Sequence, residues 1–116
     1  MNVVDLSKTS LRDLNSRFHN LPKDTNERLW KLTNVHGEHA CAVGLTQPIE
    51  VHIHGHIGYY CAGMNQHATV VIHGQCGVGV AENMMSGEVR VKGTASSAAG
   101  ATGQGGLLVI EGDAGT

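Results

Sequence analysis

Apolar residues occupy the first and third positions of four short segments of the chain, and every segment closes with a glycine. The segments are residues 51–55, 70–74, 89–93 and 108–112. Their closing glycines, which are Gly55, Gly74, Gly93 and Gly112, follow one another at a constant 19-residue interval. A period of two places alternate side chains on opposite faces of a strand. A strand repeated at a fixed step of this length predicts a solenoid, whose coils bury apolar residues by stacking.

Stacking at this step aligns equivalent residues of successive coils about 4.8 Å apart. Val51, Val70, Val89 and Leu108 then run along the interior. Each closing glycine is expected to turn a corner at positive φ, which is favourable for glycine alone. The predicted fold is all-β: a right-handed parallel β-helix with one strand in each 19-residue coil. Left-handed β-helix acyltransferases are the alternative, although their hexad repeat gives about 18 residues per turn.

Residues 1–48 have other patterns and are expected to form a helix-and-strand arm before the β-helix of residues 49–116. Apolar residues at helical spacing in the first part are Leu11, Leu14, Phe18 and Leu21. Ser10 is placed to cap this helix and Pro22 to end it. The apolar run 41–45 is expected to be a returning strand. Residues 49–116 allow about three and a half coils, so we expect the β-helix to continue beyond them.

Composition fits a narrow coil and excludes several classes of partner. The chain has 116 residues, of which 16 are glycine and only 3% are aromatic. The formal net charge of −2 gives no reason to expect nucleic acid or an anionic membrane as partner. No apolar run approaches the ~20 residues of a membrane span, and no secretory leader is visible, so a cytoplasmic location is expected. The three cysteines form no CxxC pair and are expected to be reduced, small apolar residues.

Three stretches of the sequence resemble a known family. GHIGYYCAGMN (55–65), GVAENMMSG (79–87) and AGATGQGGLLVIEG (99–112) are similar to the GXGXG β-helix domain at the C-terminal end of the glutamate synthase large (alpha) subunit. The free-standing bacterial form, which is the GlxC-like or N-methylglutamate synthase type, is the most similar. This resemblance covers essentially the whole chain.

The resemblance implies a non-catalytic scaffold in an oxidoreductase complex. Its partners would be a class II glutamine amidotransferase subunit and an FMN-dependent glutamate synthase-like subunit. FMN and iron–sulfur clusters would then belong to a partner, and this chain would hold the partners in register. The resemblance implies no catalytic or cofactor-binding residue in this chain.

Histidines and one corner of the coil supply the candidate sites. His52 and His54 share a strand face, and His73 follows His54 by one 19-residue step. Imidazoles this close could bind Zn²⁺ or Ni²⁺, which gives an alternative function as a free-standing module with a metal-binding face. The adjacent Tyr59 and Tyr60 are expected to face opposite ways. The outward tyrosine and Glu82 are candidate interface residues.

Overall fold

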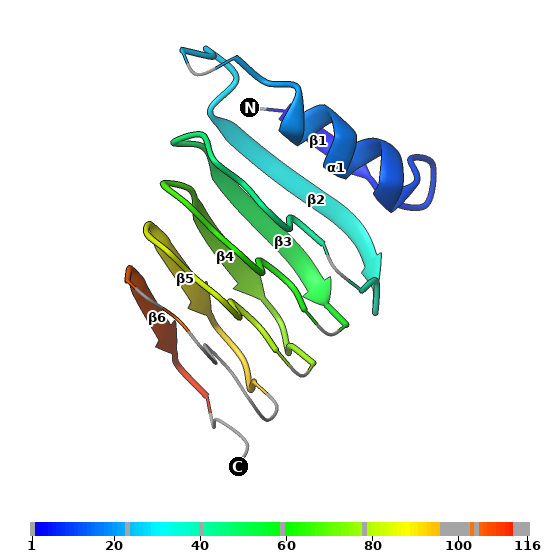
Figure 1. The fold of residues 1–116 in the computed structure, drawn as a ribbon. Helices are drawn as coiled ribbons and strands as arrows, with labels where there is room; N and C mark the ends of the chain where they lie inside the picture. The colour runs from blue at the N-terminus through cyan, green and yellow to red at the C-terminus, as the bar shows by residue number, and fades with distance from the viewer. Residues whose placement is uncertain are drawn as a thin grey trace.

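The computed structural model of the chain describes residues 2–22, 24–39, 41–58, 60–77, 79–95, 103 and 105–112. These residues contain one helix, α1 (Leu11–His19), and six strands. The strands are β1 (Asn2–Asp5), β2 (Leu29–His36), β3 (Glu50–His56), β4 (Thr69–His73), β5 (Glu88–Val91) and β6 (Leu107–Ile110). All six pair in parallel and in chain order within one sheet (Figure 1). The predicted all-β solenoid with one strand per coil is confirmed.

The 19-residue step sets the register from β3 onward. Val51 lies opposite Val70, which lies opposite Val89, which lies opposite Leu108. The first coil does not follow the 19-residue step. Trp30 on β2 lies opposite Val51, and the two residues are two positions farther apart in the chain than the step. A bulge between positions 32 and 35 then removes one of these extra positions, since Val35 lies opposite Gly55. The repeat seen in the sequence therefore begins one coil later than the sheet itself.

The segment before residue 48 belongs to the same sheet as the later coils. β1 and β2 form its first two strands, with α1 in the connection between them. The returning strand expected at 41–45 is wrong, because residues 41–44 form consecutive turns. The division of the chain at residue 48 stays a prediction, although the sheet continues across it. No helix within the described ranges is long and apolar enough to cross a membrane.

Residues with left-handed backbone conformation alternate along the turns opposite the sheet. Ala42, Ala62 and Ala81, one from each of three coils, have φ of 56°, 54° and 55°. Such a conformation costs of order 1 kcal/mol or more in a residue other than glycine. Hydrogen bonds between coils offset this cost, since the Ala62 and Ala81 N–H groups donate to carbonyls of the preceding coil at 2.9 and 2.8 Å. The turns are thus stacked and paired, as the strands are.

The closing glycines are required for a reason other than the predicted one. Gly55 has a φ of +138°, but Gly74, Gly93 and Gly112 lie outside the positive-φ region, so that part of the prediction is wrong. A Cβ on Gly74 would lie 2.1 Å from the carbonyl oxygen of Gly55. At Gly93 and Gly112 the corresponding distance to the glycine of the preceding coil is 2.5 and 2.6 Å. Glycine is needed there because the backbones of successive coils touch.

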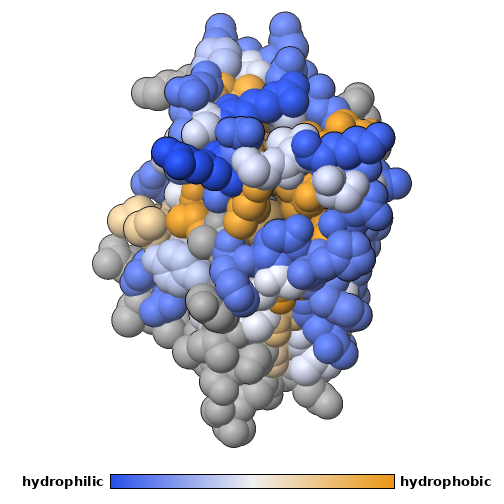
Figure 2. Space-filling model, turned by 90° about the vertical axis from the view of Figure 1, so that its right-hand side faces the viewer, coloured by the Kyte–Doolittle hydropathy of each residue, from blue (hydrophilic) through white to orange (hydrophobic). Residues whose placement is uncertain are grey.

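The core is a set of apolar columns inside the coil. Its central residues are all fully buried: Val51, Ile53, Val70, Ile72, Val89 and Val91. Alanine fills the narrow turns, where Ala62 and Ala81 are also fully buried. Seen from the side, apolar surface shows through between hydrophilic margins (Figure 2). Small and β-branched side chains therefore fill the coils from β3 onward, whereas Trp30, opposite Val51, fills the N-terminal end of the core.

α1 covers the N-terminal end of the stack (Figure 1). Ser10 caps it as predicted, because its hydroxyl accepts a hydrogen bond from the Asp13 N–H at 3.1 Å. Phe18 is buried and meets the ring of Trp30 edge to face, with centroids 5.0 Å apart. Asn15 Oδ1 accepts a hydrogen bond from the Ala42 N–H at 3.0 Å. The helix thereby supplies the acceptor that a preceding coil supplies elsewhere in the stack.

Candidate functional site

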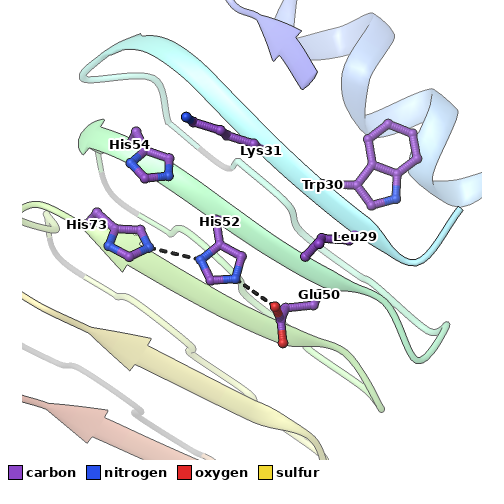
Figure 3. A pocket seen from close by; sticks show the side chains of 7 residues that line it. All are labelled: Leu29, Trp30, Lys31, Glu50, His52, His54 and His73. Carbon is purple, nitrogen blue, oxygen red and sulfur yellow. Dashed lines mark hydrogen bonds and ion pairs between the residues drawn. The ribbon is translucent and has the colours of Figure 1, made fainter. Parts of the chain in front are cut away.

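Side chains on the outer face of β2, β3 and β4 surround a hollow of about 310 Å³. We call these residues the histidine face: Leu29, Lys31, Glu50, His52, His54 and His73. Parallel pairing places them, since His52 lies opposite Lys31 and His54 lies opposite His73. Figure 3 shows the three imidazoles side by side, with Lys31 and Leu29 on the neighbouring strand. The structure thus brings together the three histidines that the sequence singled out.

The imidazoles are stacked ring on ring. The centroids of His54 and His73 are 4.4 Å apart and their planes differ by 3°. His52 and His73 are also stacked, at 5.2 Å and 20°. The predicted stacking of His73 on His54 is therefore confirmed.

A chain of two hydrogen bonds runs through this stack. His52 Nε2 lies 2.7 Å from Glu50 Oε2, and His52 Nδ1 lies 2.9 Å from His73 Nε2 (Figure 3). A neutral His52 that donates its Nε2 proton to the carboxylate has a lone pair on Nδ1. That lone pair accepts the proton of His73 Nε2, which leaves Nδ1 of His73 as an acceptor. When both rings are neutral, Glu50 therefore selects the tautomer of each.

The surroundings favour the neutral form of two of the rings. Burial is the main cause of the lowered pKa of His54, followed by the positive charge of Lys31. Burial also lowers the pKa of His73 most, and the neighbouring histidines, Lys92 and Lys31 lower it further. Each desolvated ring would have to gain a proton beside other cations. At neutral pH the hollow therefore holds the cation of Lys31 next to the uncharged rings of His54 and His73.

This arrangement does not favour the metal site considered from the sequence. In the part of the chain that the structure describes, no group of three or more His, Cys, Asp or Glu residues is placed to hold a metal ion. Both ring nitrogens of His52 are already engaged, one by Glu50 and one by His73. A metal ligand needs a free lone pair directed at the ion, so His52 would first have to break these bonds.

The predicted interface residues lie at one corner of the coil. Tyr59 is outside the described residues, whereas Tyr60 and Glu82 are both half-buried. Both lie near Gly79, where an added Cβ would be 2.9 Å from Glu82 Oε2 and 3.7 Å from Tyr60 Cδ1. The structure thus brings Tyr60 and Glu82 together across two coils. Their role as an interface stays a prediction.

The three cysteines are buried, unpaired thiols. Burial raises the pKa of Cys41 to about 12. A hydrogen bond with Cys76, followed by burial, raises the pKa of Cys61. A nucleophilic cysteine needs the opposite, a lowered pKa and access to solvent. The prediction that these residues pack as small apolar side chains is confirmed, and their reduced state stays a prediction.

Sequence reasoning missed three members of the histidine face, which are Leu29 and the two charged residues Lys31 and Glu50. The signal for Glu50 was present, because a residue two positions before His52 shares its strand face. Lys31 was hidden by the irregular first coil. Lys31 lies opposite His52 in the sheet, but in the chain it precedes His52 by two positions more than the 19-residue step. Counting back from His52 by this step therefore does not reach it.

Comparison with known proteins gives one relative. Over 89 residues, or 77% of its length, the chain is 52% identical to Protein GlxC of Rhizobium meliloti (strain 1021). The chain is therefore homologous to GlxC over most of its length. The matched residues make up 39% of GlxC, so the chain spans less than half of that relative. No protein-family model matches the chain, and no solved structure does.

Proposed function

From its homology to GlxC, we propose that this chain is a non-catalytic subunit of an N-methylglutamate synthase-like complex. Identity of 52% over 77% of the chain is the observation that carries the proposal. The proposed partners are a class II glutamine amidotransferase subunit and an FMN-dependent glutamate synthase-like subunit. Those partners would carry the chemistry, including FMN and iron–sulfur clusters. The chain would hold them in register, in the cytoplasm.

The solenoid suits a scaffold because its outer side chains stand on a regular, hydrogen-bonded frame. Stacked coils present extended surfaces to partners. The corner at Tyr60 and Glu82 is the proposed contact. Two exposed methionines lie close to it along the turns, Met64 at 46% and Met85 at 48% exposure. Tyrosine and methionine are enriched in protein interfaces, where their large side chains exclude water.

Affinity purification from the native cell tests this proposal. A tagged full chain should recover both proposed partners, identified by mass spectrometry. Tyr60→Ala and Glu82→Ala should each lower that recovery several-fold. Glu88→Ala is the matched control, since it also removes a half-buried carboxylate, but from the strand β5. It should leave recovery unchanged.

Two outcomes would contradict the proposal. If the wild-type chain recovers neither proposed partner, the proposed membership of such a complex is refuted. Glutaminase activity or flavin absorbance in the purified chain would show that it is not merely a scaffold.

A further inference from the structure

Basic residues in the central outer column of the sheet follow a regular pairing rule. On β3, Glu50 lies 2.7 Å from His52, two positions along the strand. On β5, Glu88 lies 3.6 Å from Arg90, again two positions along. A residue two positions away on a strand lies on the same face, so the carboxylate and the base meet. Each of these two coils therefore pairs its basic residue with a carboxylate of its own.

The coil of β2 breaks this rule. Lys31 occupies the column of His52 and Arg90, but Leu29 occupies the column of Glu50 and Glu88. Within the described ranges, no carboxylate lies within ion-pair distance of Lys31. The contrast with Lys92 is direct, because the Nζ of Lys92 lies 2.8 Å from Glu111 Oε2. Lys31 is a half-buried cation whose equivalent partner has been replaced by an apolar side chain.

The hollow beside Lys31 has the other parts of a small-molecule site. Its volume of about 310 Å³ is at the lower end of the usual range for ligand pockets. His54 stacks on His73 but makes no hydrogen bond with any described residue, so its ring N–H is available. Leu29 supplies apolar surface next to these polar groups. A cation, a free donor and an apolar wall meet in one place.

We propose that this hollow binds the carboxylate group of a small organic acid. Lys31 would pair with the carboxylate, His54 would donate a hydrogen bond to it, and Leu29 would contact the carbon chain. Charge-assisted hydrogen bonds of this kind are the stronger ones. Glu50 stands at the rim and repels negative charge that is concentrated on one group, which favours carboxylate groups, each with a single charge, over a dianionic phosphate. This site goes beyond the proposed scaffold function and does not depend on it.

Titration of the full 116-residue chain with succinate tests the proposal. Carbon–proton NMR of the imidazoles reports on the site directly, and the signals of His54 and His73 should shift and saturate. Lys31→Gln should weaken binding at least tenfold while keeping most of the side-chain stem. Leu29→Glu should do the same, since it places beside Lys31 the carboxylate that β3 and β5 carry at this position. Lys92→Gln is the matched control and should bind as the wild type does.

Acidification should tighten binding. The titratable or charged groups that line the hollow are His52, His54, His73, Lys31 and Glu50. Lys92 acts on His73 from outside the hollow and is paired with Glu111. Protonation of His54 and His73, as the pH falls through their lowered pKa values, adds positive charge beside the ligand. Circular dichroism of each variant at each pH would verify that the fold is intact.

Several results would overturn the proposal. These are the absence of saturable succinate binding, equal binding by Lys31→Gln, and inorganic phosphate shifting the same signals as strongly as succinate. An acidic peptide serves as a separate arm. If tri-glutamate binds and succinate does not, the carboxylate belongs to a protein partner and the small-molecule site is refuted.

Discussion

Alanine at position 74 would test whether glycine is needed where successive coils touch. The new Cβ would lie 2.1 Å from the carbonyl oxygen of Gly55 and 2.6 Å from its carbonyl carbon. Contacts of Cβ atoms below 3.0 Å are essentially never observed, so one coil must move by about 0.9 Å relative to the other. Both groups in conflict are backbone, and no side-chain rotation relieves them.

The required displacement also acts on the hydrogen bonds between these coils. The Ile57 N–H donates to the Gln75 carbonyl at 2.9 Å. A shift of about 0.9 Å along this direction would take it beyond the range of a hydrogen bond. Overpacking costs about 1–3 kcal/mol, and each lost hydrogen bond adds about 1 kcal/mol. We therefore expect Gly74→Ala to lower the free energy of unfolding by about 3 kcal/mol.

Urea unfolding followed by far-UV circular dichroism measures this loss. With a slope of about 1.5 kcal/mol per molar urea, the midpoint should fall by about 2 M. Gly37→Ala is the control, because Gly37 has a φ of +80° and nothing within 4 Å of an added Cβ. It should cost about 1 kcal/mol through backbone strain alone. If Gly74→Ala costs no more than Gly37→Ala, the argument from close approach is refuted.

Three further predictions concern other contacts. Asn15→Ala removes the acceptor of the Ala42 N–H and should lower the free energy of unfolding by about 1–3 kcal/mol in urea; unchanged stability would refute the capping role. Acidification from pH 7 should destabilise the chain, because the lowered pKa values of His54 and His73 mean that the unfolded state binds more protons just below their ordinary pKa of 6.5. Urea midpoints measured across this pH range should show a smaller slope in the double variant His54→Gln/His73→Gln, and an equal slope would contradict this assignment. Cys41, whose pKa is raised to about 12, should resist iodoacetamide at pH 8 until urea unfolds the chain, as mass spectrometry would show; rapid labelling of the folded chain would contradict its burial.

The regular part of the fold was predictable because a constant step carries information about register. Once Gly55, Gly74 and Gly93 follow each other at equal spacing, the pairing of Val51 with Val70 follows, and the structure has it. The proximity of His54 and His73 came from the same reasoning. The hydrogen bond between His52 and His73 could not be predicted in this way, because it depends on the orientations of the two rings, which the sequence does not specify.

The turn at residues 41–44 was mistaken for a strand because backbone conformations in the turns also alternate with a period of two. Left-handed residues alternate with others at Ala42 and Gly44, and again at Tyr60, Ala62 and Met64. Such alternation gives the same apolar pattern as a strand, and residues 41–45 were predicted as one for that reason. The reason for glycine at the constant spacing was also misassigned. Both a positive φ and a close approach between backbones require glycine, and the sequence does not distinguish them. The structure separates the two causes, because the φ of Gly74 lies outside the positive region and a Cβ added to Gly74 would lie 2.1 Å from the Gly55 carbonyl oxygen.

The order of strands along the sheet has a consequence for synthesis on the ribosome. Chain order and spatial order are the same from β1 to β6, so each strand pairs with the one completed just before it. The end that α1 covers also leaves the exit tunnel before the later coils do. A new coil can then add to a finished, capped surface after about 20 more residues, which is about one to four seconds of translation. Assembly can therefore proceed one coil at a time, without waiting for a distant part of the chain.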